Sequence, residues 1–428
     1  MYFGLMIIIF IVGYAMIALE HPLKINKSAT ALLLAAVIWA VYALMGPGFD
    51  HESLIGHLGE TAEILFFLLG AMTIVEIVDR HDGFSIITDR ITTTNKKKLL
   101  WIISILTFFM SAVLDNLTTA IVICALLRKL IQDQKTRWFF CGMVILAANA
   151  GGAWSPIGDV TTIMLWIKGN ITAGKIILET FLPALVSMLV PLAIISFTMK
   201  GNVERPKQND EAAVSSISKK QSKIILCMGV GLLLFVPVFK TITHLPPYLG
   251  ILLGLGILWV TTEIMHKNRP EIYSRLNVTS IIQRVDTPSV LFFLGILMAV
   301  SCLNEAGHLK LLAESLDKLG NVYVINLIIG VLSSIIDNVP LVAAAMGMYP
   351  IEAVGHFAVD GAFWEGLAYC AGTGGSLLII GSAAGVAIMG MEKIDFIWYL
   401  KKITLWALLG YLAGAGVFYL MSSFILHT

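Results

Sequence analysis

SAVLDNLTTA, at residues 111–120, and SSIIDNVPLV, at residues 333–342, are two copies of one motif that lie 222 positions apart. Each copy places an acid and an amide inside an otherwise apolar segment; the corresponding residues are Asp115 and Asp337, and Asn116 and Asn338. A polar pair repeated at the same place in two apolar segments predicts a duplicated helical fold, with one such break in each half.

The composition places this fold in a lipid bilayer. Of 428 residues, 57% are hydrophobic and 13% are charged, and the mean hydropathy is +0.86. A soluble domain has about 25% charged residues. The net charge of +1 offers no acidic or basic excess for a nucleic-acid partner. The five cysteines are scattered in apolar runs without CxxC spacing, which indicates packing roles.

Ten apolar runs are long enough to cross the membrane, since a spanning helix needs about 20 residues. Eight are uninterrupted: 2–19, 28–45, 62–78, 175–199, 223–239, 248–265, 288–303 and 403–425. The first has no basic leader, so we expect a retained span rather than a signal peptide. Two more runs, 138–167 and 361–391, contain paired glycines and are expected to be broken helices.

The two segments that carry the Asp-Asn pairs, 99–131 and 322–349, are predicted to be re-entrant hairpins. Each is split near its middle, which leaves limbs of about 15 residues that cover roughly 22 Å of a core about 30 Å thick. The fold class is therefore an all-α polytopic membrane protein with about ten spanning helices and two re-entrant hairpins.

Flanking charges predict the orientation, because cytoplasmic loops are enriched in lysine and arginine. The first hairpin is bordered by basic residues: Lys96, Lys97, Lys98, Arg128 and Lys129. Acidic or mixed residues border the second hairpin and fill 50–60, which predicts that these lie outside. Residues 1–200 and 223–428 then form two inverted repeats of five crossings each, joined by a cytoplasmic linker at 201–222. The protein is expected in the cell inner membrane, with both termini on the outer side.

A second motif recurs at the glycine breaks, where NAGGAWSPIGD at 149–159 matches GTGGSLLIIGS at 372–382, offset by 223. Inverted repeats with broken helices are typical of secondary transporters, whose substrates bind where the breaks meet near the midplane. Unwound backbone, hydroxyls, amides and carboxylates suit a hard cation such as sodium. The expected ligands are Asp115, Asn116, Thr118, Asn149, Ser155, Asp159, Asp337, Asn338, Thr373 and Ser376.

Three of these residues are aspartates in apolar surroundings, where an ionised carboxylate costs about 3 kcal/mol on insertion scales. Asp115 and Asp337 could serve only as helix N-caps, but serine or threonine would cap without a charge. Asp159 has no acidic counterpart in the second half, where Ser382 takes its place. We therefore expect these three carboxylates to bind the cation or protons. Glu76 on the third span is a possible proton relay.

The LDN and IDN tips, the stretch AANAGGAWSPIGDVTT and the segment TIVEIVDRHDGF together resemble the NhaD-type sodium/proton antiporters of the ion transporter superfamily. The resemblance runs from about residue 62 to residue 391. It implies exchange of sodium or lithium for protons across the cytoplasmic membrane, without a cofactor and without enzymatic chemistry. Proteins of this architecture are often homodimers.

Other functions remain open at the level of the residues. An anion or arsenite carrier of the same superfamily would share the architecture, although related anion symporters carry Ser-Asn-Thr at the tips. Two carboxylates there would repel an anion. An intramembrane aspartyl protease would also hold aspartates in the membrane, but it needs one catalytic pair and has no use for a duplicated, inverted scaffold. A channel would not need broken helices in both halves.

Overall fold

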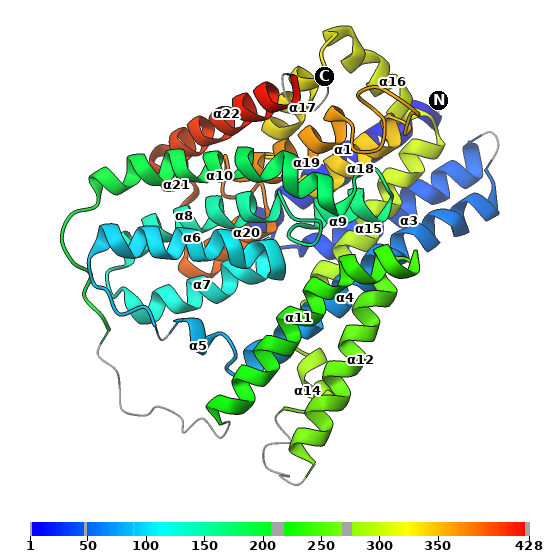
Figure 1. Cartoon of the computed structure of the whole chain (residues 1–428). Helices are drawn as coiled ribbons and strands as arrows, with labels where there is room; N and C mark the ends of the chain where they lie inside the picture. Colours follow the sequence, from blue (N-terminus) through cyan, green and yellow to red (C-terminus); the bar gives the residue numbers. More distant parts are fainter. Residues whose placement is uncertain (1, 47–48, 89, 207–217, 268–275, 424–428) are drawn as a thin grey trace.

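The computed structural model describes residues 2–46, 49–88, 90–206, 218–267 and 276–423, and within these ranges it is built from helices (Figure 1). In the first half they are α1 (Tyr2–Ala18), α2 (Glu20–Leu23), α3 (Lys27–Met45), α4 (His51–Arg80), α5 (Ser85–Thr88), α6 (Lys96–Leu114), α7 (Asn116–Leu130), α8 (Gln134–Gly152), α9 (Val160–Ile167) and α10 (Ala173–Thr198). The second half holds α11 (Lys219–Thr243), α12 (Pro247–His266), α14 (Val278–Ile282), α15 (Thr287–Glu305), α16 (His308–Leu316), a 3₁₀ turn at Asp317–Leu319, α17 (Val322–Leu332), α18 (Asn338–Met348), α19 (Ala362–Gly374), α20 (Ala383–Glu392), α21 (Phe396–Lys402) and α22 (Thr404–Met421). Part of the expected linker, 207–217, and the end of the last expected span, 424–425, lie outside the described residues.

Eight helices of the described chain are long and apolar enough to cross a membrane: α3, α4, α6, α10, α11, α12, α15 and α22. Seven of them coincide with predicted spans, which confirms an all-helical, multi-span protein. The eighth, α6, was expected to be a hairpin limb of about 15 residues and has 19. It is longer because Asn95 caps the Lys98 amide and the three lysines form a polar first turn.

Helix α4 is also longer than predicted. Residues 50–60 were expected to form an acidic loop, but the carboxylate of Asp50 accepts hydrogen bonds from the Glu52 and Ser53 amides and starts a helix of 30 residues. An N-cap of this kind satisfies backbone donors that water would otherwise bind. The polar first turns of α4 therefore continue the spanning helix beyond its apolar run.

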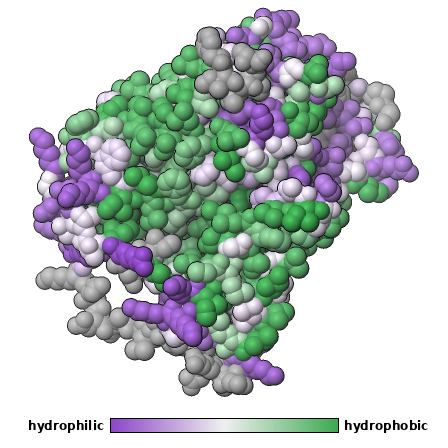
Figure 2. Space-filling model, viewed as in Figure 1, coloured by the Kyte–Doolittle hydropathy of each residue, from purple (hydrophilic) through white to green (hydrophobic). Residues whose placement is uncertain are grey.

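Apolar side chains cover much of the outside of the molecule. Figure 2 shows one face, on which hydrophobic residues form a broad band with hydrophilic residues gathered toward its ends. Leu44 and Phe197 are 85% and 73% exposed. Large apolar side chains exposed over such an area would be a liability in water, but they match the hydrocarbon of a bilayer.

Each Asp-Asn segment forms two helices that are joined at the Asp-Asn tip and are called here the first and second hairpins; the limbs of the second pack mainly on other helices, α17 on α19 and α18 on α15. Helices α6 and α7 pack against each other and are separated by Asp115 alone. In the second hairpin α17 ends at Leu332, five residues before α18 is capped by Asp337. The glycine-containing runs are broken as expected, α8 from α9 and α19 from α20. In Figure 1 the breaks of both kinds meet in the middle of the molecule.

The paired glycines allow backbone to pack directly on backbone. A Cβ atom on Gly151 would lie 2.2 Å from the carbonyl oxygen of Phe108, and one on Gly374 would lie 2.0 Å from that of Gly330. Matching hydrogen bonds join the same helix pairs, Ser111 to the Ala148 carbonyl and Ser333 to the Ala371 carbonyl. Each hairpin is therefore fixed to its own broken helix by equivalent contacts.

Replacing Gly374 by alanine is expected to lower the thermal stability of the detergent-solubilised protein. The added methyl group would overlap the backbone of Gly330, which cannot change rotamer as a side chain can. Overpacking of this kind typically costs about 1–3 kcal/mol. Gly174→Ala is the matched control, since a Cβ atom there has no neighbour within 4 Å. Equal melting temperatures for the two variants, measured by fluorescence-detected size exclusion after heating, would contradict the close packing.

Helix packing divides most of the described helices into two groups. The long-helix bundle contains α1, α3, α4, α11, α12 and α15. The hairpin bundle contains α6–α10 and α17–α22. The bundles meet mainly where α18 packs on α15, with smaller contacts of α9 on α4 and of α6 on α11. The broken helices and both hairpin tips thus belong to the same bundle.

Candidate functional site

Four helices of the hairpin bundle begin at one place near its centre. Their N-caps are Asp115 for α7, Asp159 for α9, Asp337 for α18 and Ser382 for α20. Each helix N-terminus carries the equivalent of about half a positive charge. Carboxylate caps offset this charge, which explains how three acids are accommodated among apolar helices.

Asp159 lies at the centre of this arrangement and is 1% exposed. Its Oδ2 accepts a hydrogen bond of 2.7 Å from Asn116 Nδ2, and both of its oxygens lie 3.4 Å from Asn338 Nδ2. Its Oδ1 also caps α9 by accepting from the Thr161 amide at 3.0 Å. One buried carboxylate therefore joins the tips of both hairpins to the first broken helix.

A chain of amides extends from Asp159 into the second broken helix. Asn116 Nδ2 also donates to Asn149 Oδ1 at 3.1 Å. Asn149 in turn donates from Nδ2 to the hydroxyls of Ser376 and Ser382, each at 2.9 Å. The network therefore links residues from both halves of the sequence, and Asn116, Asn149, Asn338 and Ser376, which are expected ligands, belong to it.

Asp115 occupies a backbone conformation that is unfavourable for any residue with a side chain. Its φ is 72° and its ψ is 161°, a region used almost only by glycine. Its carboxylate accepts hydrogen bonds from the Thr118 amide at 2.8 Å and from the Thr118 hydroxyl at 2.7 Å. An aspartate in a conformation that favours glycine marks this carboxylate as a candidate functional group.

Four predicted residues make contacts elsewhere. The Ser155 hydroxyl donates to the Ala112 carbonyl, which fixes the end of the first hairpin, and the Thr373 hydroxyl donates to a carbonyl of its own helix. The carboxylate of Asp337 lies 3.8 Å from the ammonium of Lys27 in the long-helix bundle. Glu76 is half-buried and pairs with Arg80 at 3.0 Å, so its role as a proton relay stays a prediction.

Two threonines beside the site, Thr119 after the first hairpin tip and Thr161, are not among the expected ligands. The hydroxyls of Thr119 and Thr161 are buried, and that of Thr119 completes no hydrogen bond within the described residues. Thr161 lies next to the Asp159 carboxylate. The sequence offered a signal, because Thr161 follows Asp159 at the start of a helix, just as Thr118 and Thr119 follow the first tip. Such oxygens are available to a ligand.

These groups suit a monovalent hard cation better than a multivalent metal. Within the described ranges no three His, Cys, Asp or Glu side chains come close enough to hold a metal ion together. Asp115 and Asp337 are in electrostatic range of Asp159 without sharing its ligands. The amide nitrogens of Asn116 and Asn338 face the Asp159 carboxylate, so a cation bound there would require these amides to turn their oxygens toward it. A proton could take its place on the same carboxylate.

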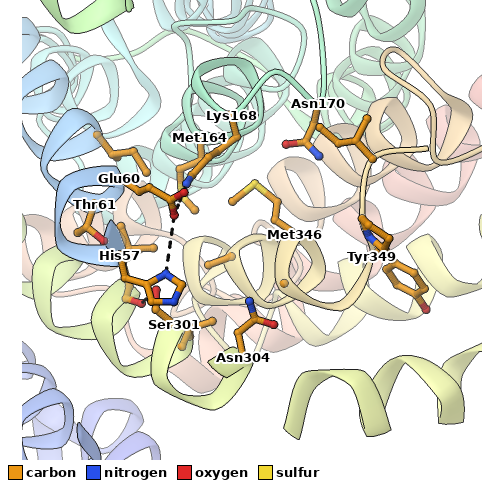
Figure 3. A pocket seen from close by; sticks show the side chains of 17 residues that line it. His57, Glu60, Thr61, Met164, Lys168, Asn170, Ser301, Asn304, Met346 and Tyr349 are labelled. Atoms are coloured by element: carbon orange, nitrogen blue, oxygen red, sulfur yellow. Dashed lines mark hydrogen bonds and ion pairs between the residues drawn. The ribbon is translucent and has the colours of Figure 1, made fainter. Parts of the chain in front are cut away.

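A cavity of about 340 Å³ opens between α4, α9, α15 and α18, at the boundary of the two bundles (Figure 3). Met164 of α9 and Met346 of α18 line it, so it is bounded by two helices that begin at the candidate site. At 1.5 Å per residue, Met164 is about 7 Å along α9 from the Asp159 cap. Glu60 crosses the cavity rim to Lys168 at 2.5 Å, and His57 Nε2 lies 3.2 Å from Glu305.

Comparison with known proteins finds relatives that match nearly the whole chain. The profile of the citrate transporter family CitMHS matches residues 5–365. Sodium/proton antiporter 1 of Arabidopsis thaliana is 50% identical over 96% of this chain and 71% of its own length. The Na(+)/H(+) antiporter NhaD of Alkalimonas amylolytica is 32% identical over 98% of this chain and 91% of its own.

The YdaH transporter of Alcanivorax borkumensis has a similar fold, with a TM-score of 0.53 at 14% identity over 93% of this chain and 97% of that one. This likeness supports the architecture only. The near full-length matches confirm the family expected from the hairpin tips and the glycine motif. The chain is a multi-pass membrane protein that belongs to the CitMHS family of transporters and, within it, to the sodium/proton antiporters of NhaD type.

Proposed function

We propose that this chain exchanges sodium or lithium for protons by alternating access, with Asp159 at the centre of the site. The observation that carries the proposal is the position of this carboxylate, which is buried and hydrogen-bonded to the tips of both hairpins. Sodium and a proton compete for it, and Asp115 supplies a second carboxylate nearby. Each translocation then carries one or the other cation.

Two inverted repeats, 1–200 and 223–428, give this site its two routes of access. Equivalent Gly-Gly and serine contacts in the two halves support the duplication. The hairpins enter the bilayer from opposite faces and α1 and the broken helices cross it, which gives ten crossings with both termini outside. The long-helix bundle stays in place while the hairpin bundle moves against it. The cavity of Figure 3 is the outer route to α9 and α18.

An anion as cargo is disfavoured by the same geometry. The citrate transporter profile matches the chain, so citrate is the natural alternative. Helix N-termini attract carboxylates, but here three of the four are capped by acids. None of the side chains that hydrogen-bond to Asp159 or to Asn149 is a cation, so nothing at the network offsets the charge of a tricarboxylate.

Cation-driven proton flux in everted vesicles tests the proposal. Sodium or lithium added to acid-loaded vesicles is expected to collapse the pH gradient, whereas choline, citrate and arsenite leave it unchanged. If sodium and a proton compete for one carboxylate, the half-saturation constant for sodium rises as the pH falls. Once the carboxylate is mostly protonated, the rise is about tenfold for each unit by which the pH is lowered. Sodium-independent uptake of citrate, or a half-saturation constant that is constant with pH, would overturn the assignment.

A further inference from the structure

Asp337, at the tip of the second hairpin, faces the long-helix bundle. One of its carboxylate oxygens lies 3.8 Å from Lys27 Nζ of α3. Its backbone N–H donates to the hydroxyl of Tyr14 in α1 at 3.0 Å. The adjacent residue, Asn338, points the other way and reaches Asp159. Two adjacent residues of this tip therefore contact different parts of the protein: Asn338 contacts the candidate cation site and Asp337 contacts the long-helix bundle.

The two hairpin tips differ in how their aspartates are satisfied. Asp115 accepts two hydrogen bonds from Thr118, through its amide and its hydroxyl. At the equivalent position the second hairpin has Pro340, which has no N–H and no hydroxyl. Asp337 keeps one long bond of 3.4 Å from the Val339 amide. Lys27, from the other bundle, supplies the interaction that the hairpin itself lacks.

Lys27 is not placed by its own helix. It is the first residue of α3, where a cation is opposed by the positive end of the helix. Its side chain is only 20% exposed and its ammonium lies 4.5 Å from the centre of the Phe292 ring. The Glu20 carboxylate bonds to the Lys27 backbone amide. Asp337, itself 15% exposed, is the carboxylate paired with the ammonium in the described chain.

We propose that Lys27 is a tethered cation that occupies Asp337 in the state seen here and competes with the transported cation for the second hairpin. This inference rests on the proposed function. When the hairpin bundle moves, Asp337 leaves Lys27, and an ionised carboxylate without a partner is costly among apolar helices. Sodium or a proton bound on the hairpin side removes that cost, so the empty, unprotonated carrier stays held by Lys27. Lys27 is thus a positioning residue that couples movement of the hairpin bundle to the binding of sodium or a proton.

Substituting Lys27 by glutamine tests the competition. The half-saturation constant for sodium is expected to fall about twofold to fivefold, the effect of removing a partly exposed ion pair. Lys27→Arg keeps the charge and is expected to remain close to wild type. Lys24→Gln is the matched control, since Lys24 is exposed at the end of α2. A half-saturation constant in Lys27→Gln that equals or exceeds the wild-type value overturns the proposal.

A charge reversal separates this role from a structural one. In the double variant Lys27→Asp with Asp337→Lys the pair is restored in the opposite sense, so the thermal stability lost in either single variant is expected to return. Transport is expected to stay absent, because the hairpin then carries an ammonium that cannot accept sodium. Recovery of transport would show that the pair is only structural. Absence of sodium-driven flux in the wild type would instead refute the proposed function.

Discussion

Asp159→Asn is expected to abolish sodium-driven proton exchange while the protein remains folded. Unit charges about 4 Å apart interact by about 4 kcal/mol at an effective dielectric constant of about 20, which corresponds to roughly a thousandfold in cation affinity. An amide cannot exchange a proton at this position. Asparagine is nevertheless as good an N-cap as aspartate, so it can still accept from the Thr161 amide and start α9. Flux in everted vesicles and the melting temperature measure the two effects separately.

Asp133→Asn is the matched control for this experiment. Asp133 caps α8, the other limb of the same broken helix, and its carboxylate accepts from the Thr136 amide at 2.8 Å. It is exposed at the far end of α8 from the site. We expect wild-type exchange in this variant. If Asp159→Asn retained exchange at a similar level, Asp159 would be a structural cap and the cation site would have to be placed elsewhere.

The Asp115→Gly variant is expected to be more stable than the wild type and to have lost exchange activity. The conformation at φ 72° and ψ 161° costs a residue with a side chain about 1–3 kcal/mol, and glycine removes that cost. Loss of the cap to Thr118 costs only a few tenths of a kcal/mol when glycine is the replacement. Exchange is expected to be lost because the second carboxylate of the site is missing.

Asp115→Ala provides the comparison, since it removes the same carboxylate but keeps a Cβ atom in the strained conformation. Its melting temperature is expected to fall below the wild-type value, and its exchange is expected to be lost as in the glycine variant. Glycine and alanine variants of equal stability would show that the backbone at the tip is not strained. Full exchange in the glycine variant would limit Asp115 to capping.

The parts of the site that the sequence predicts are those that the duplication makes visible. The two Asp-Asn tips and the two glycine pairs could be found because each has a partner about 222 positions away. Intramembrane polarity then marked Asn116, Asn149 and Asp159 as ligands, and the structure joins them by hydrogen bonds. Residues whose role depends on local chemistry in an apolar segment are therefore accessible to sequence reasoning.

Contacts between distant elements were not accessible in this way. Lys27 and Asp337 are 310 positions apart, and their pairing depends on how α3 packs beside the second hairpin. The partner of Ser155 could not be predicted either. Its hydroxyl is expected to bind the cation, but it donates a hydrogen bond to the backbone of α6. Helix ends were missed for a different reason, because caps such as Asp50 extend a span into residues that hydropathy assigns to a loop.

The four helices that begin around Asp159 make the polarity of the site adjustable without any change of architecture. Their ends together contribute the equivalent of about two positive charges, which the carboxylates of Asp115 and Asp159 offset, while Asp337 is paired with Lys27. With neutral caps at the same positions, the helix N-termini would give the site a positive electrostatic potential that attracts anions. Whether such a carrier handles metal ions or acids is then decided by a handful of side-chain atoms, so descendants of one ancestor can diverge to cargoes of opposite sign through point substitutions.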